Sequence, residues 1–334
     1  MGTAFPRGVP QDRLWDGFFA DHYRDVRIAA RIFANSGVDH RHPTVDPRHE
    51  DISALSTGDR MRRYVAEALP LGRSAVTAAL ADAGIAAADV GLLAVATCTG
   101  YATPGVDVGL AADLGLRPDT RRLLIGHMGC YAALPGLAAV ADYVTAHDRP
   151  AVLLCVELTS LHIQPPTRDV SQVVSHALFS DAAAAVVVTP GGPGSAVLDV
   201  VAATDPSTAE QMTWDVTDLG FRMGLSPRVP DSLATQLPGA VAGLLDPYGL
   251  DPTDIAHWAV HPGGPRILDV VQKELDLPPA ALAPSRETLR RHGNCSSATV
   301  LLVLGGIAAR PGEHVVALAF GPGLTLYGAL LRAE

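Results

Sequence analysis

The sequence is poor in several features that macromolecule-binding proteins need. It holds a single lysine, Lys273, among 25 basic residues, only 5% of its side chains are aromatic, and its formal net charge is −10 over 334 residues. A nucleic-acid backbone demands clustered Lys and Arg, and no basic block occurs here, so we expect no nucleic-acid partner. A phosphate-bearing small ligand would have to be held by arginines, which grip anions through a planar fork.

Segments that would direct the chain into or across a membrane are also lacking. No apolar run reaches the roughly 18 residues that a membrane span needs, because Gly, Pro, Asp or Arg interrupts each candidate. No charged n-region followed by an apolar h-region opens the chain. The four cysteines, Cys98, Cys130, Cys155 and Cys295, lack the spacing of metal ligands. We therefore expect a soluble, cytoplasmic protein with no resident metal.

Short apolar runs alternate with helix-like stretches along the chain. The runs predict short buried strands at 92–98, 121–126, 151–157, 182–189, 257–261 and 314–320. Ala and Leu recur at helical spacing in residues 74–84, 134–147 and 296–310. This alternation is typical of an α/β protein whose strands are covered on both faces.

The chain also contains an internal repeat. Residues 84–97 align without gaps on residues 249–262, at a constant offset of 165 residues. At an offset of 164 residues, Cys130 falls on Asn294, and each of the two follows a glycine and opens a small-residue helix. If two similar halves pack about a pseudo-two-fold axis, these helix starts face each other, and His261 ends a strand beside them.

Cys130, His261 and Asn294 have complementary chemistry. A cysteine at a helix N-terminus beside an imidazole forms its thiolate more readily and becomes a nucleophile. An imidazole N–H and an asparagine N–H form a donor pair suited to an oxyanion, either a thioester carbonyl under attack or an enolate left by decarboxylation. Taken singly, each residue has an ordinary structural explanation, and only the repeat joins them. Together they predict acyl transfer or Claisen condensation.

Six motifs carry a family resemblance along nearly the whole chain. They are MGCYAALPG (128–136), ELTS (157–160), ALFSDAAAAVVV (177–188), HPGGPRILD (261–269), GNCSSA (293–298) and FGPGLTL (320–326). Together they resemble type III polyketide synthases, the chalcone synthase-like enzymes of the thiolase superfamily. The resemblance implies a thiolase-like α/β fold in which two similar halves, residues 1–205 and 206–334, pack about a pseudo-two-fold axis in αβαβα layers. It also implies a homodimer.

The resemblance assigns roles to individual residues. Cys130 matches the acylated nucleophile, His261 its activating base, and Asn294 the partner of His261 in the oxyanion site. The other matched positions are Phe179 and Phe221 at the junction of the CoA tunnel and the cavity, Cys98, Thr159, His162 and Ser296 along the elongation cavity, and Arg41 in the basic run that binds CoA.

The activity that this resemblance implies is an iterative decarboxylative condensation of malonyl-CoA onto an acyl-CoA starter. The starter is held on Cys130, malonyl-CoA itself is a candidate for it, and the product closes to an aromatic ring or a pyrone. No cofactor is implied. A ketoacyl-ACP synthase III-like enzyme, which condenses once or transfers an acyl group, is the alternative within the superfamily. A non-catalytic thiolase-fold subunit is the alternative of another class, and the intact Cys130, His261 and Asn294 argue against it.

The beginning of the chain departs from the family pattern. The residues MGTAFPRG match only the end of the opening strand of the related enzymes. We therefore expect the natural chain to begin further upstream.

Overall fold

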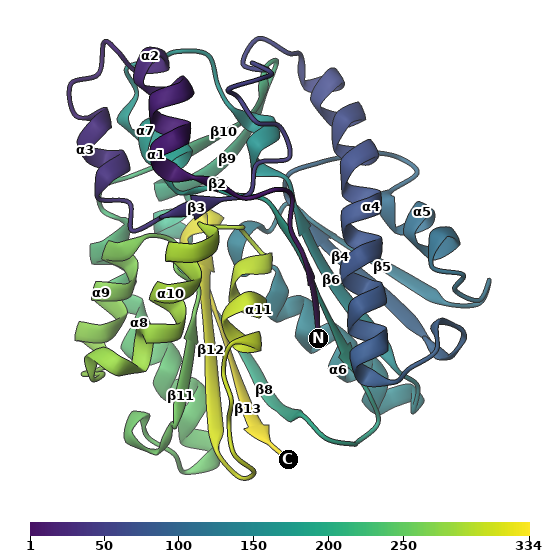
Figure 1. Ribbon diagram of the computed structural model, residues 1–334. Coiled ribbons are helices and arrows are strands. Elements are labelled where there is room, and N and C mark those ends of the chain that lie inside the picture. Colours follow the sequence, from purple (N-terminus) through teal and green to yellow (C-terminus); the bar gives the residue numbers. More distant parts are fainter.

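Two β-sheets form the centre of the protein, as seen in a computed structural model that describes residues 1–334 (Figure 1). The first sheet has the order β1-β7-β6-β4-β5, with β1 at Gly2–Ala4, β4 at Leu92–Thr97, β5 at Arg121–Gly126, β6 at Ala151–Glu157 and β7 at Ala182–Val188. The second sheet has the order β11-β12-β13-β8, with β8 at Ser195–Thr204, β11 at His257–Val260, β12 at His314–Gly321 and β13 at Thr325–Ala333.

The two sheets repeat one topology. In the first sheet, β1 pairs antiparallel with β7, β7 pairs antiparallel with β6, and β6 pairs parallel with β4. In the second sheet, β8 pairs antiparallel with β13, β13 pairs antiparallel with β12, and β12 pairs parallel with β11. β4 therefore corresponds to β11, and β6 to β12, as the repeat in the sequence predicts. The first sheet has a further edge strand, β5, for which the second sheet has no counterpart.

Helices form three layers around the sheets. α4 (Thr57–Ala83) and α5 (Val106–Asp113) cover the outer face of the first sheet, and α8 (Val229–Leu245) with α9 (Pro265–Glu274) covers the outer face of the second. α6 (Ala133–His147) and α11 (Ala298–Gly305) lie between the sheets and contact both of them. This is the predicted αβαβα layering, and Figure 1 shows the two halves side by side.

Two excursions lie at one end of these layers. The N-terminal excursion consists of β2 (Val9–Pro10), α1 (Gln11–Leu14), α2 (Ala20–His22), α3 (Ala29–Ala34) and β3 (His40–Arg41). It packs against α7 (Val170–Leu178) and α10 (Ala283–His292). The second excursion is a hairpin of β9 (Met212–Thr217) and β10 (Gly220–Leu225), which also packs on α7.

The alternation of side chains along β4 explains why the middle layer is so tightly packed. Leu93 and Val95 point to the outer cluster beneath α4, whereas Ala94 and Ala96 point to the inner cluster that holds α6 and α11. Because the inner side chains are small, two helices fit between the sheets. Their N-terminal ends meet near the pseudo-two-fold axis, where the predicted site residues lie.

The predicted strands are all present, but one of them is not buried. β5 lies at the edge of the first sheet, and its side chains are mostly exposed; those of Leu123 and Leu124 are 39% and 43% exposed. The prediction of a buried strand at 121–126 is therefore wrong about burial, because an apolar run does not distinguish an edge strand from a central one.

Helix lengths and the division between the halves also differ from the sequence pattern. α4 begins at Thr57, well before the predicted 74–84, and continues through Pro70. α11 ends at Gly305, before the predicted end at residue 310. The division at residue 205 stays a prediction, and β8, which lies before it, pairs with β13 of the second sheet.

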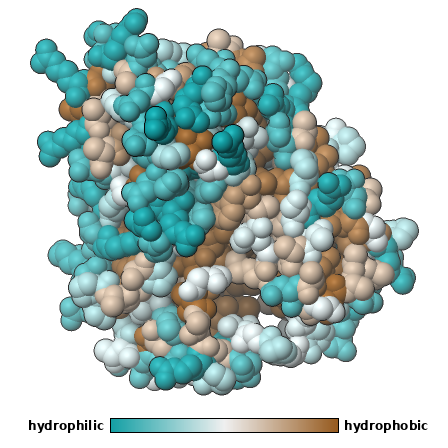
Figure 2. All heavy atoms as spheres, viewed as in Figure 1, coloured by the Kyte–Doolittle hydropathy of each residue, from teal (hydrophilic) through white to brown (hydrophobic).

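The surface in Figure 2 has one apolar zone on the face shown. Apolar residues gather between the two halves, around the N-terminal strand and α11, while the N-terminal excursion is more hydrophilic. None of the helices combines the length and the apolar character that crossing a membrane requires.

Candidate active site

Cys130 lies where the two halves meet. It belongs to the turn Gly129–Tyr131, which leads into α6, and its side chain is buried. Gly129 has a φ of 79°, and a side chain there would collide with Pro322 in the turn after β12. A Cβ at Gly321 would lie 3.1 Å from the backbone nitrogen of Cys130. The carboxyl end of β12 therefore approaches the start of α6 closely.

Asn294 occupies the equivalent place in the second half. It follows Gly293, whose φ is 71°. The Asn294 Oδ1 accepts a hydrogen bond of 2.9 Å from the Ser296 backbone N–H, so the Nδ2 atom remains as the free donor. Burial raises the pKa of the Cys130 thiol, and the nearby polar side chains of Ser296 and Asn294 oppose that rise. The structure thus brings Cys130 and Asn294 together.

His261 follows β11 at the same end of the second sheet. Its backbone N–H donates to the carbonyl of Leu318 at 2.7 Å, which fixes the residue beside β12. The side chain is 1% exposed, and neither ring nitrogen has a hydrogen-bond partner within the protein. Burial lowers the pKa of His261 to about 3, so the imidazole is neutral at pH 7 and available to a bound substrate.

The pKa of Cys130 shifts in the direction opposite to the one that the sequence suggests. Burial raises the pKa of the thiol to about 12, and the hydrogen bonds from Ser296 and Asn294 only partly oppose this rise. The free protein therefore holds a neutral thiol and a neutral imidazole. Cys130 becomes a nucleophile when a base takes its proton during the attack on a thioester.

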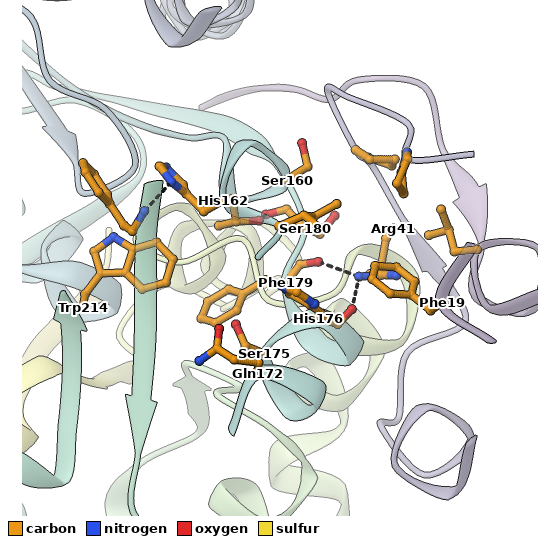
Figure 3. Close-up of a pocket in the computed structure, with 16 residues that line it drawn as sticks. Phe19, Arg41, Ser160, His162, Gln172, Ser175, His176, Phe179, Ser180 and Trp214 are labelled. Carbon is orange, nitrogen blue, oxygen red and sulfur yellow. Dashed lines mark hydrogen bonds between the residues drawn. The ribbon is translucent and has the colours of Figure 1, made fainter. Parts of the chain in front are cut away.

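A cavity next to Cys130 adjoins a second cavity. Cys98, Thr159, Phe179 and Ser296 line the first cavity together with Cys130. The second cavity, shown in Figure 3, is lined by His162, Phe221 and Arg41 among others. Thr159, Phe179 and Trp214 line both, so these three side chains separate the two spaces.

An aromatic wall formed by His162, Trp214 and Phe221 lies on the side of the hairpin. The rings of His162 and Phe221 stack with their centroids 4.5 Å apart, and Trp214 meets both edge-on. His162 Nε2–H donates to the Thr99 carbonyl at 2.7 Å, and its Nδ1 accepts from the Phe221 N–H at 3.0 Å. Burial lowers the pKa of His162 to about 3. His162 is thus a neutral, fully paired residue that holds the hairpin in place.

Glu157 was not singled out in the sequence analysis, although it ends β6 beside this site. Its fully buried carboxyl accepts hydrogen bonds from the Cys98 N–H at 3.0 Å, the Thr99 hydroxyl at 2.8 Å and the Ser297 hydroxyl at 2.5 Å. Burial raises the pKa of Glu157. A carboxylate at the end of an otherwise apolar strand was the signal available for it. Trp214 was missed as well, and no local pattern marks it.

Arg41 lies deeper than a residue of the CoA-phosphate mouth is expected to lie. Its side chain is buried, and its Nη1 donates to the carbonyls of His176 and Phe179. The guanidinium carbon lies 5.2 Å from the ring centre of Phe19 and 5.8 Å from that of Phe33. Figure 3 shows the two hydrogen bonds of Arg41, with Phe19 beside it, at the edge of the second cavity.

Two protein-family models together match nearly the whole chain. The model of the N-terminal domain of chalcone and stilbene synthases matches residues 1–193, and that of the C-terminal domain matches residues 196–334.

Named relatives and solved structures agree with these matches. A 1,3,6,8-tetrahydroxynaphthalene synthase of Streptomyces peucetius is 38% identical, over 92% of this chain and 84% of that protein. The alpha-pyrone synthesis polyketide synthase-like Pks18 of Mycobacterium tuberculosis is 32% identical, over 99% and 89%. The crystal structure of 1,3,6,8-tetrahydroxynaphthalene synthase from Streptomyces coelicolor superimposes with a TM-score of 0.93 at 29% identity, covering 100% of this chain and 98% of that one.

Proposed function

This chain belongs to the chalcone and stilbene synthase family and is a type III polyketide synthase, and we propose that Cys130, His261 and Asn294 carry its reaction. The observation that carries this proposal is the meeting of two equivalent helix starts. One of them supplies a thiol, the other supplies an amide close enough to that thiol to oppose the rise of its pKa, and an unpaired imidazole follows the neighbouring β11.

Loading of the starter uses the thiol and the imidazole. Cys130 Sγ attacks the thioester carbonyl of an acyl-CoA while His261 accepts the thiol proton. When the tetrahedral intermediate collapses, the bond to the CoA sulfur breaks, and His261 returns the proton to that sulfur. The products are the acylated Cys130 and free CoA. Burial keeps the imidazole neutral at pH 7, and this neutral state supports the role because it leaves a ring nitrogen free to accept the thiol proton.

Extension uses the imidazole and the amide as donors. Malonyl-CoA loses carbon dioxide, and the electron pair of the broken bond forms an enolate, whose oxygen accepts hydrogen bonds from His261 and Asn294 Nδ2. The enolate carbon then attacks the acyl group on Cys130, and the thiolate leaves. The chain, now two carbons longer, is a thioester of CoA; the Cys130 thiolate attacks this thioester, the bond to the CoA sulfur breaks, and CoA leaves before the next round. Each step uses only side chains and CoA thioesters, so we propose that no cofactor takes part.

The cavity residues suit short starters. Phe179 separates the space around Cys130 from the second cavity, and the aromatic wall of His162, Trp214 and Phe221 limits that space from the hairpin side. Two of the relatives are named for a naphthalene and a pyrone product. We propose malonyl-CoA as the starter and an aromatic product, with Cys98 and Ser296 contacting the growing chain.

Replacing His162 tests this view of the cavity. His162→Thr removes the ring that stacks on Phe221 and the acceptor for the Phe221 N–H, so we expect longer products than those of the parent protein. Product masses after incubation with malonyl-CoA check this expectation. Unchanged products would show that the wall does not limit chain length.

A homodimer is proposed on the basis of β5. This strand has a neighbour on one side only, and its free edge carries the exposed Leu123 and Leu124. Exposed apolar edges are usually covered in native proteins. A second copy that adds its own β5 would cover both and join the two first sheets.

The decisive experiment is incubation with radiolabelled malonyl-CoA, alone and with a panel of acyl-CoA starters, alongside Cys130→Ala. We expect products with several malonyl units, which Cys130→Ala does not form. A single condensation, or activity only with carrier-protein substrates, would instead assign the protein to the ketoacyl synthase III type.

A further inference from the structure

The segment that holds Asn294 in place runs from Leu178 to Asp181. Leu178 accepts a hydrogen bond of 2.8 Å from the Asn294 N–H, and Ser180 donates one of 2.9 Å to the Asn294 carbonyl. Phe179, between them, lies directly alongside Asn294. A Cβ at Gly293 would lie 2.8 Å from the Leu178 oxygen, so the two segments are packed backbone to backbone. The backbone of Asn294 is therefore positioned by the residues on either side of Phe179.

Residues 41–44, here called the clasp, hold this segment from the other side. Arg41 Nη1 donates to the Phe179 carbonyl at 3.3 Å and to the His176 carbonyl. The His42 N–H donates to the Ser180 hydroxyl at 2.7 Å, and the Thr44 N–H donates to Asp181 Oδ2 at 2.7 Å. The clasp thus contacts three consecutive residues, Phe179, Ser180 and Asp181.

Arg41 is the part of the clasp that acts on the helix end. α7 ends at Leu178, and a helix leaves its last carbonyls without partners. A cation at this end satisfies those carbonyls and interacts favourably with the helix dipole. Burial lowers the pKa of Arg41 to about 10, so the guanidinium remains charged at neutral pH, with the charge of the buried Asp181 opposing the shift. The Arg41 Cγ would lie 3.4 Å from a Cβ atom added at Gly293, the residue before Asn294.

We propose that Arg41 is a positioning residue for Asn294: it fixes the carboxyl end of α7 and Phe179, and through them the amide that stabilises the enolate. The inference rests on the function proposed above for Asn294. It assigns Arg41 a place inside the protein, and the phosphates of CoA are left to arginines nearer the surface. A misplaced donor stabilises the enolate less but leaves Cys130 free to react, so Arg41 affects decarboxylation more than loading of the starter.

A double-mutant cycle on malonyl-CoA decarboxylation tests this proposal. Release of labelled carbon dioxide is measured for the parent protein, Arg41→Gln, Asn294→Ala and the double variant. We expect Arg41→Gln to lower kcat by about 10-fold, since small misplacements of a catalytic group cost one to two orders of magnitude. KM for malonyl-CoA and the rate of Cys130 acylation should change less than about twofold. In the Asn294→Ala background, Arg41→Gln should have no further effect, because the group that it positions is gone.

Arg60 provides the matched control. Like Arg41 it is a buried arginine that donates to backbone carbonyls, among them those of Leu55 and Leu161, but it donates no hydrogen bond to residues 178–181. If Arg60→Gln lowers the decarboxylation rate, the fold-loss should be the same in the parent protein and in the Asn294→Ala variant. Arg41→Lys, which keeps the charge, should recover part of the loss. If Arg41→Gln does not fold, Ser180→Ala removes the clasp contact of His42 and should show the same dependence on Asn294.

The outcomes separate the two proposals. If Arg41→Gln lowers the decarboxylation rate equally in the parent protein and in the Asn294→Ala variant, the positioning role of Arg41 is overturned. A parallel loss of Cys130 acylation would overturn it as well and leave Arg41 a merely structural role. Unchanged decarboxylation in Asn294→Ala alone would overturn the proposed function of Asn294 itself.

Discussion

The two halves of this protein share one frame and differ in the side chains at equivalent places. The start of the inner helix carries Cys130 in the first half and Asn294 in the second. At the constant offset of 165 residues, His261 in the second half corresponds to Ala96, near the end of β4, in the first. β6 ends at Glu157, whereas β12 ends at Gly321. The repeated frame thus provides symmetric positions, and the side chains that occupy them place the thiol on one side of the axis and two hydrogen-bond donors on the other.

Replacing the thiol should have the largest effect and should separate the tasks of the two halves. We expect Cys130→Ala to lower product formation by at least about 1,000-fold, because no covalent acyl intermediate can form. Decarboxylation of malonyl-CoA should continue, since His261 and Asn294 remain. Assays of product mass and of carbon dioxide release check both parts. Loss of both activities together would show that the halves do not divide the work in this way.

Replacing the amide should produce the opposite pattern. Asn294→Ala removes one donor to the enolate, which typically costs about 100- to 1,000-fold in rate. The decarboxylation rate should fall by that amount, while the acylation of Cys130, followed by the mass of the intact protein, should remain. Acylation that falls as far as decarboxylation would contradict the assignment of Asn294 to the enolate.

Glu157 allows a test of the difference between the ends of β6 and β12. Glu157 Oε2 accepts from the Cys98 N–H and the Thr99 hydroxyl, and Oε1 accepts from the Ser297 hydroxyl. Glu157→Gln replaces one of these two acceptors by a donor, so we expect a loss of about 1–3 kcal/mol in the free energy of unfolding. Because burial raises the pKa of Glu157, the parent protein loses the stability contributed by the neutral acid as the pH rises through that raised value.

The destabilisation caused by Glu157→Gln should therefore be larger at about pH 4.5, near the ordinary pKa of a glutamate, than at pH 8, as measured by urea unfolding. Glu287→Gln, at the surface, is the control and should change stability by less than about 1 kcal/mol. A difference between the parent protein and Glu157→Gln that grows with pH would contradict the raised pKa.

The edge strand allows the mildest test, because only the first half has it. Leu124→Arg places a charge on the exposed edge of β5 and should convert a dimer into monomers, with a smaller effect on activity than the variants above. Analytical ultracentrifugation measures the change. Val216→Arg is the control, since Val216 is 68% exposed on β9, away from this edge. A monomeric parent protein, or dissociation of both variants, would argue against the β5 interface.

The sequence by itself determined the strands, the internal repeat and the family, because these depend on periodicity and on motifs that are local in the chain. It also marked Cys130, His261 and Asn294 as a set, since the repeat placed two of them at equivalent positions. It could not show that β5 is an edge strand, because hydrophobicity does not report which neighbours a strand has.

Only the tertiary structure decided the electrostatic state of the site and the partners of its side chains. A helix start favours a thiolate, but the depth of burial is a property of the assembled layers, and it raises the pKa of Cys130 instead. The same holds for Arg41, which the resemblance places in the basic run that binds CoA and which lies buried at the end of α7 in the fold. Hydrogen bonds between residues more than a hundred positions apart depend on packing, and no local pattern encodes them.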